Sequence, residues 1–330
     1  MRIHRYLFAT ILLTCAATAQ QLSQATADAI SKAKESNAQR RFSDTVKTLQ
    51  SLPKDELKKC FQCAIELALA ENNLGQTKIA LETSSRGIAL ANTPLEKSMA
   101  HRVKGSALLS GSSADSKLLT SAEDEFRQSL AADPQATMSR FLLGLTLLKE
   151  KRDDEGKQTL AEFMKLEPQD SDLAKYAQKL IAQPRRARER FAPEFEVTTA
   201  EGEHLTSADL AGRVVVLDFW ATWCPPCRES VPELKDLSRK YANKKFTIIS
   251  ISNDDDQQKW HDYIAKNKMT WPQFYDDGKK VSTLFNVHAF PTYMIIDGDG
   301  AIVKELTGLD PTKSVAARLK DTLHQMKELE

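Results

Sequence analysis

The chain has 330 residues, which is enough for two or three domains that each bury a hydrophobic core. Its 46 Lys and Arg residues nearly balance its 45 Asp and Glu residues, so the formal net charge is only +1. Because the two signs are interspersed and no basic tract is present, the composition argues against binding to nucleic acid or to an anionic membrane surface. We therefore expect no nucleic-acid partner.

The N-terminus has the pattern of a secretory signal peptide over residues 1–19. Arg2 and Arg5 form a basic start, an apolar run follows at 6–13, and the Ala-Thr-Ala sequence at 17–19 is a small-x-small cleavage site. The apolar run is too short to remain as a membrane-spanning anchor, so no membrane span is expected in the mature chain. This pattern predicts an exported, periplasmic protein.

A second processing pattern overlaps the first. The Leu-Leu-Thr-Cys sequence at 12–15 loosely resembles a lipoprotein box, in which Cys15 would become a lipidated first residue and anchor the protein to a membrane. Thr14 is larger than the residue that this motif prefers, so we favour ordinary secretion over lipidation. Either route delivers the mature chain to an oxidising compartment, where cysteine pairs form disulfides.

Residues 21–183 are predicted to be helical throughout, with internal repeats at a period near 34 residues. From the clearest to the most degenerate, the repeats cover 137–168, 97–134, 60–94 and 25–53, with a capping helix at 172–181. Small residues let paired helices approach, and larger apolar residues fill the groove to the next repeat. The pattern resembles tetratricopeptide repeats, although most of the aromatic positions are replaced. This resemblance implies an all-α domain that binds a protein partner; the alternative is a helical spacer.

A first pair of cysteines lies near the start of a predicted helix in these repeats. Cys60 and Cys63 are three positions apart and share one helix face. No strand precedes them and no proline separates them. In an exported protein, such a pair is predicted to form a local structural disulfide. Two buried thiols, or electron exchange with a second cysteine pair, are the alternatives.

The segment 184–190 contains the one local cluster of positive charge and is interpreted as a solvated linker, with a docking patch as the alternative. The second domain, 191–330, contains the Trp-Cys-Pro-Pro-Cys sequence at 223–227. The run before it, 213–220, is short and rich in β-branched residues, which predicts a buried central strand. The run after it has apolar residues at helical spacing. Cys224 is therefore expected at a helix N-terminus, where the macrodipole favours a thiolate.

A dithiol in this position is predicted to be catalytic, with Cys224 as the nucleophile and Cys227 as the resolving cysteine. A structural bridge is the first alternative. Zinc would need two further ligands, and His204, His261 and His288 show no ligand-like pairing. A c-type haem would need a histidine directly after the second cysteine, where an arginine stands. We expect no metal and no cofactor.

These motifs resemble the thioredoxin superfamily, and most closely its secreted TlpA/ResA-like thiol–disulfide oxidoreductases. The matching residues are 219–227, the domain opening at 192–195, and the Phe-Pro-Thr sequence at 290–292 with the strand and Asp-Gly turn after it. The resemblance covers residues 191–330 and implies an α/β thioredoxin fold. It also implies that the bond before Pro291 is cis and that this proline packs against the dithiol.

The resemblance assigns further site residues. Asp218 aligns with the buried acid that helps to deprotonate the second cysteine in thioredoxins, but the lysine that usually partners this acid would fall near 249–251, where none stands. Burial without a cation should raise the pKa of Asp218 and favour proton shuttling; the alternative is a carboxylate bonded to backbone or water. Pro291 and the backbone beside it would hold a substrate strand. The remaining substrate contacts are assigned to Trp223, Pro225, Pro226, Phe290 and Thr292.

The sequence thus predicts an exported thiol–disulfide oxidoreductase that reduces or exchanges disulfides in protein partners, with helical repeats as a partner-binding platform. A peroxiredoxin-like peroxidase is one alternative, but it needs a peroxidatic cysteine after a proline and a threonine, which this motif does not provide. A repeat-based interaction protein with a thioredoxin-like binding module is another, but it would not need an intact dithiol. The direction of electron flow does not follow from the motif, because reduction potentials in this superfamily differ widely.

Overall fold

The structure, a computed structural model, describes residues 22–112 and 116–326 except 309 and 311, together with Leu329. It divides into two compact units, with the boundary between Pro184 and Arg185. The predicted signal segment and Cys15 lie outside the described residues. Among the described helices, none has both the length and the apolar character that a bilayer crossing requires.

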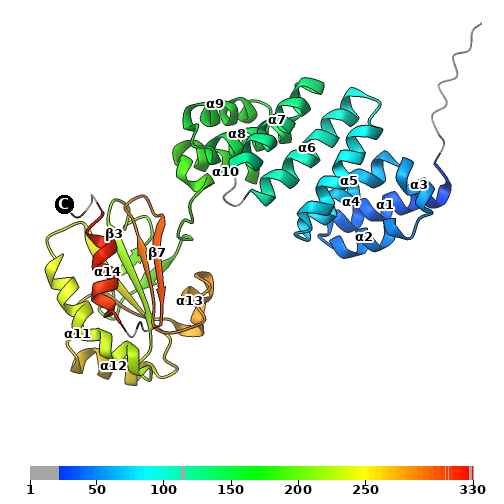
Figure 1. Cartoon of the computed structure of the whole chain (residues 1–330). Helices are drawn as coiled ribbons and strands as arrows, with labels where there is room; N and C mark the ends of the chain where they lie inside the picture. Colours follow the sequence, from blue (N-terminus) through cyan, green and yellow to red (C-terminus); the bar gives the residue numbers. More distant parts are fainter. Residues whose placement is uncertain (1–21, 113–115, 309, 311, 327–328, 330) are drawn as a thin grey trace, which may run out of the picture. The chain divides into compact units, whose positions relative to one another are not determined.

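In the part of the first unit that the structure describes, all regular secondary structure is helical and loops join the helices (Figure 1). Its helices are α1 (Gln24–Ala38), α2 (Phe42–Gln50), α3 (Lys54–Lys59), α4 (Phe61–Asn73), α5 (Thr77–Leu90), α6 (Pro94–Gly111), α7 (Ser116–Ala132), α8 (Thr137–Lys149), α9 (Asp153–Met164) and α10 (Asp172–Ala182). The all-α prediction for this half is confirmed. The tetratricopeptide assignment stays a prediction.

Local sequence signals set where several of these helices begin. The hydroxyl groups of Ser23 and Ser171 accept hydrogen bonds from backbone N–H groups at the starts of α1 and α10. Thr93 caps α6 in a reciprocal capping box with Glu96, and Pro94 occupies the first helical position. These caps satisfy backbone N–H groups that have no partner within the helix.

Small residues let neighbouring helices approach closely. A Cβ atom added to Gly105 in α6 would lie 2.7 Å from the ring of Phe126 in α7, which is fully buried. In α8, a Cβ atom on Gly144 would lie 2.8 Å from Leu160 in α9. These contacts match the small-against-large packing that the repeat pattern predicts.

Gly105→Ala is therefore expected to destabilise the first unit. Displacing a packed ring costs about 1–3 kcal/mol. This cost equals or exceeds the gain of about 1 kcal/mol that alanine brings in helix propensity. We expect a net loss of up to about 2 kcal/mol in the free energy of unfolding, measured by urea denaturation. Lys97→Ala, an exposed position of the same helix, is the matched control. An equal or smaller loss for Gly105→Ala than for the control would contradict the packing argument.

The second unit is built around a five-stranded mixed sheet of order β5-β4-β3-β6-β7. Its strands are β3 (Val214–Trp220), β4 (Phe246–Ser252), β5 (Gln273–Tyr275), β6 (Thr292–Ile296) and β7 (Ile302–Thr307), and a separate antiparallel hairpin joins β1 (Glu196–Thr198) and β2 (His204–Thr206). Strand β3 is parallel to β4 and antiparallel to β6. The predicted α/β thioredoxin fold of this half is confirmed.

Helices cover both faces of this sheet (Figure 1). They are α11 (Pro225–Lys240), α12 (Gln257–Lys266) and α14 (Val315–Leu323) on one face and the short α13 (Lys280–Leu284) on the other. Along β3, Val216 and Trp220 pack toward α11, while Leu217 and Phe219 pack toward α13. All seven residues of β3 are buried, as expected for a central strand.

Most of the segment 184–190, predicted to be a solvated linker, falls in the second unit and makes ion pairs there. Arg185 lies 2.6 Å from a carboxylate oxygen of each of Glu189, Asp297 and Asp299. Because Asp297 is only 7% exposed, its ion pair with Arg185 is partly shielded from solvent. The sequence pattern gave no sign of these contacts, because the two aspartates stand 112 and 114 residues further along the chain.

Candidate active site

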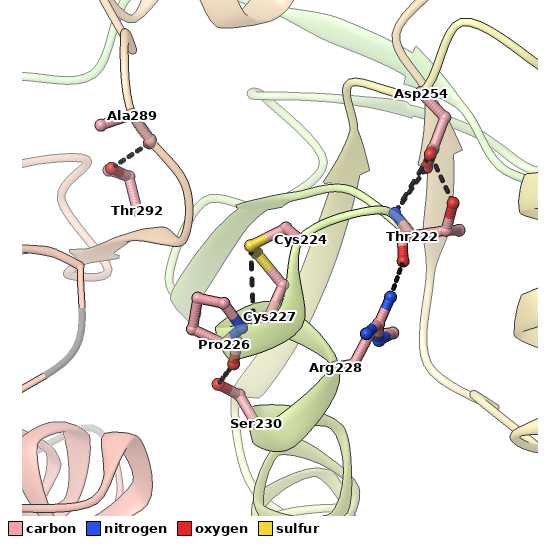
Figure 2. The surroundings of a disulfide bond; sticks show 9 residues. All are labelled: Thr222, Cys224, Pro226, Cys227, Arg228, Ser230, Asp254, Ala289 and Thr292. Atoms are coloured by element: carbon pink, nitrogen blue, oxygen red, sulfur yellow. Dashed lines mark hydrogen bonds between the residues drawn. A yellow bond between two sulfur atoms is a disulfide. The ribbon is translucent and has the colours of Figure 1, made fainter.

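Cys224 and Cys227 form a disulfide at the start of α11 (Figure 2). Cys224 is the N-cap residue, and its sulfur accepts a hydrogen bond from the backbone N–H of Cys227 at 3.3 Å. Pro225 and Pro226 occupy the first helical positions, where a missing N–H group costs nothing. This position agrees with the prediction, and in the reduced form it favours a thiolate at Cys224.

An exposed aromatic surface adjoins the disulfide. Cys224 and Cys227 are only 4% and 2% exposed, whereas Trp223 is 58% exposed. The ring of Phe290 meets the Trp223 ring edge-on, with 6.0 Å between centroids. The structure therefore brings together two aromatic residues that the sequence assigns to substrate contacts.

The loop opposite the disulfide contains the predicted cis bond, between Phe290 and Pro291. The Pro291 carbonyl accepts a hydrogen bond from the backbone N–H of Gly308 at 2.8 Å. The Thr292 hydroxyl donates to the carbonyl of Ala289 at 2.8 Å, as Figure 2 shows. Because Thr292 is only 2% exposed, its side chain supports the loop from inside, in contrast to the substrate contact predicted for it.

The loop before the disulfide is held by Asp254, which sequence reasoning missed (Figure 2). Its buried carboxylate accepts hydrogen bonds from the Thr222 backbone at 3.0 Å, the Thr222 hydroxyl at 2.6 Å and the Ser252 hydroxyl at 2.7 Å. Arg228 donates to the Thr222 carbonyl at 3.0 Å. The available signal was the position of Asp254 two residues after the end of β4, because the carboxyl ends of parallel strands meet at one edge of a sheet.

Asp218 lies in β3 and is 2% exposed. Burial raises its pKa to about 7, while a hydrogen bond from the Ser250 hydroxyl, 2.7 Å from Oδ2, acts in the opposite direction. Ser250 is also the register partner of Asp218 in β4. It therefore lies within 249–251, where the resemblance to thioredoxins would place a lysine. A carboxyl group with this pKa exchanges protons near neutral pH.

Cys60 and Cys63 form a second disulfide. Cys60 is the N-cap residue of α4, and its sulfur accepts a hydrogen bond from the Cys63 backbone at 3.1 Å. Both cysteines are buried against Leu49 and Leu67, and the sequence has no tryptophan before position 220. Cys60–Cys63 therefore has the same N-cap arrangement as Cys224–Cys227, but it has no exposed tryptophan beside it.

A mixed sheet, a helix that begins at a Cys-x-x-Cys disulfide and a cis-proline loop together define a thioredoxin-fold dithiol protein. The Redoxin family model matches residues 187–321, which lie wholly in the second unit. Thiol-disulfide oxidoreductase ResA from Bacillus thuringiensis (strain Al Hakam) is 33% identical over 129 residues, which are 39% of this chain and 75% of that protein. Thioredoxin-like protein YneN from Bacillus subtilis (strain 168) is 30% identical over 131 residues, 39% of this chain and 76% of that protein.

Among solved structures, a thiol-disulfide oxidoreductase from Bacteroides fragilis NCTC 9343 is 29% identical, with 40% of this chain and 99% of that chain covered and a TM-score of 0.35. On the strength of the sequence matches, the chain belongs to the TlpA/ResA-like thiol–disulfide oxidoreductases of the thioredoxin superfamily. The predicted enzyme class is thereby confirmed.

Proposed function

We propose that this protein is an exported oxidoreductase that uses Cys224 and Cys227 to reduce or exchange disulfides in protein partners. The observation that carries the proposal is the position of Cys224 at the N-terminus of α11, beside the exposed Trp223. The helix dipole stabilises the thiolate, and the aromatic surface gives a partner a place to dock.

The reaction proceeds in two exchange steps. The Cys224 thiolate attacks one sulfur of the partner disulfide, so a bond forms between Cys224 and the partner while the partner's own disulfide breaks and releases a thiolate. Cys227 then transfers its proton to Asp218 and attacks the sulfur of Cys224. The mixed disulfide breaks, the partner leaves with both sulfurs reduced, and the two electrons come from the Cys224/Cys227 pair. The reverse sequence oxidises a partner dithiol.

Substrate positioning is assigned to surfaces around the dithiol. The exposed Trp223 and Pro225 and the half-buried Pro226 and Phe290 provide apolar contacts. Backbone groups beside the cis Pro291 would hold the substrate strand. This assignment keeps the predicted substrate residues except for the side chain of Thr292.

Partner trapping tests the proposal. In the full-length chain, Cys227→Ser removes the resolving thiol, so a disulfide between Cys224 and the partner should accumulate and be identified by mass spectrometry. The Cys224→Ser/Cys227→Ser double variant is the matched control and should trap nothing. The redox state of the partner in cells that lack the protein would then give the direction of electron flow. Equal capture by the single and double variants would refute the nucleophile assignment.

The helical unit is proposed to bind partners. Leu95 and Met138 are 61% and 42% exposed, and each is the second residue of its helix, α6 and α8. Exposed apolar residues at equivalent helical positions are suited to contact a protein. Leu95→Asp with Met138→Asp, added to the Cys227→Ser chain, should lower the yield of trapped partner. The same two substitutions in the chain that keeps both Cys224 and Cys227 should leave reduction of a small disulfide unchanged. An unchanged yield would favour the spacer interpretation.

Export and processing are proposed from the N-terminal sequence pattern. N-terminal sequencing of the mature protein should find Gln20 as the first residue, whereas a lipidated Cys15 at the N-terminus would establish the lipoprotein alternative. The same purified protein tests the peroxidase alternative. Rapid consumption of hydrogen peroxide in a Cys224-dependent reaction would revive it.

A further inference from the structure

A row of four buried polar side chains crosses the sheet beneath α11. Strand register places Gln273 beside Ser250, Ser250 beside Asp218, and Asp218 beside Tyr293. Each of the four is at most 2% exposed. Alternation along β3 puts Asp218 on the same face as Trp220, which packs in the cluster that also contains both cysteines of the α11 disulfide. The row therefore lies on the face of the sheet that carries the redox site.

Two hydrogen bonds lead in one direction from Trp271, beside this row, through Ser250 to Asp218. The indole Nε1–H of Trp271 donates to Ser250 Oγ at 2.8 Å, and Ser250 Oγ lies 2.7 Å from Asp218 Oδ2. An indole nitrogen is a donor only, so the Ser250 oxygen must accept from Trp271. The single hydroxyl hydrogen of Ser250 is then free to donate to Asp218, and the chain is polarised toward the carboxylate.

The two carboxylate oxygens of Asp218 are therefore not equivalent. Oδ2 is occupied by the Ser250 donor, whereas Oδ1 has no hydrogen-bond partner among the described residues. We expect Oδ1 to receive the proton when the buried carboxyl group is protonated, because both of its lone pairs are unused whereas Oδ2 already accepts one hydrogen bond.

The other groups around Asp218 do not replace Ser250. Tyr293 lies directly across from it on β6, and burial raises the pKa of this phenol, so it stays neutral. Glu233 of α11 and Arg318 of α14 both act electrostatically on Tyr293, whereas burial and Ser250 account for the pKa of Asp218. The neutral hydroxyl group of Ser250 thus stabilises the ionised form of this acid, as a neighbouring cation would otherwise do.

We propose that Ser250, held by Trp271, is a positioning residue for the redox reaction: it anchors Asp218 Oδ2 so that Oδ1 exchanges the proton of the dithiol. This inference rests on the proposed role of Asp218. Ser250 stabilises the ionised carboxylate by a directed hydrogen bond rather than by charge, and it leaves the acid close to the pH at which proton transfer is most useful. Trp271 prevents the hydroxyl group from turning away.

The direct test is to titrate the Asp218 carboxyl group by ¹³C NMR in the full-length protein with both disulfides intact, so that the cysteines do not titrate. Loss of a hydrogen bond to the charged form should raise the Asp218 midpoint in Ser250→Ala by about one pH unit. Trp271→Phe should raise it by less, because the hydroxyl group remains but is no longer oriented. Ser252→Ala is the matched control, because it removes another buried hydroxyl group from the same strand, one that donates to Asp254.

The pH profile of mixed-disulfide resolution by Cys227 gives a second readout. Ser250→Ala should move this profile upward by about the same pH unit as the Asp218 midpoint. If the Asp218 midpoint in Ser250→Ala equals the midpoint in Ser252→Ala, the role of Ser250 is overturned. Loss of mixed-disulfide resolution in Asp218→Asn would still support Asp218 as the proton acceptor in that case. An unchanged profile in Asp218→Asn would instead overturn the role of Asp218, and the positioning role with it, even if the midpoint moved in Ser250→Ala.

Discussion

Cys224→Ser is expected to lower the rate of partner-disulfide reduction by at least about three orders of magnitude. Only a thiolate attacks a disulfide, and a serine hydroxyl group neither ionises near neutral pH nor forms the mixed disulfide. The helix N-terminus that favours an anion at this position cannot compensate, because the reacting atom itself is missing. Insulin reduction, followed as turbidity, measures the effect in the full-length protein.

The other disulfide provides the control for this prediction. Cys60→Ser/Cys63→Ser removes a pair with the same N-cap arrangement, in a unit that lacks tryptophan. We expect this variant to keep the rate of insulin reduction, although losing the bridge over such a short loop costs about 1–3 kcal/mol of stability. A rate as low as that of Cys224→Ser, in a variant that circular dichroism shows to be folded, would make Cys60 and Cys63 part of the electron path.

Asp218→Asn is expected to stabilise the oxidised protein strongly above neutral pH. The carboxyl group has a pKa of about 7 in the folded protein against an ordinary value of 3.8. An acid whose pKa is raised by folding favours the folded state at low pH, and this contribution is lost as the pH rises through the folded pKa. The difference converts to about 4 kcal/mol, which asparagine recovers by removing the buried charge.

Urea denaturation near pH 4 and near pH 8 measures this effect. We expect the variant to exceed the natural protein by less than about 1 kcal/mol near pH 4 and by about 3–4 kcal/mol near pH 8. Asp236→Asn, an exposed position on α11, should change stability by less than about 0.5 kcal/mol at either pH. Equal stabilisation by Asp218→Asn at both pH values would contradict a carboxylate that ionises within the fold.

The elements nearest the dithiol could be predicted because their signals are local. The apolar run at 214–217 is a buried strand, and the two prolines after Cys224 lie in the first helical positions, as their chemistry requires. In the first unit, the small residues Gly105 and Gly144 stand where helices touch. Each of these features depends on neighbours within a few positions or on a repeating pattern, and both are visible in a single sequence.

Contacts between distant positions could not be predicted in the same way. Ser250 and Trp271 both follow Asp218 by many positions, and only the sheet brings the three side chains into one hydrogen-bond chain. Asp254 reaches Thr222 because β3 and β4 are adjacent and parallel. The basic segment that looked like a free linker is fixed by carboxylates on a turn after β6.

By itself, the sequence determined that this protein carries a redox dithiol at the start of a helix, in a thioredoxin-like domain that follows a helical one. Covalent spacing and helix or strand periodicity are sufficient for that. Only the tertiary structure decided how the buried acid Asp218 is set up for proton transfer, with Ser250 on one oxygen. The pKa and orientation of a buried group depend on its desolvation and on the donors that surround it in space, and folding alone brings these together.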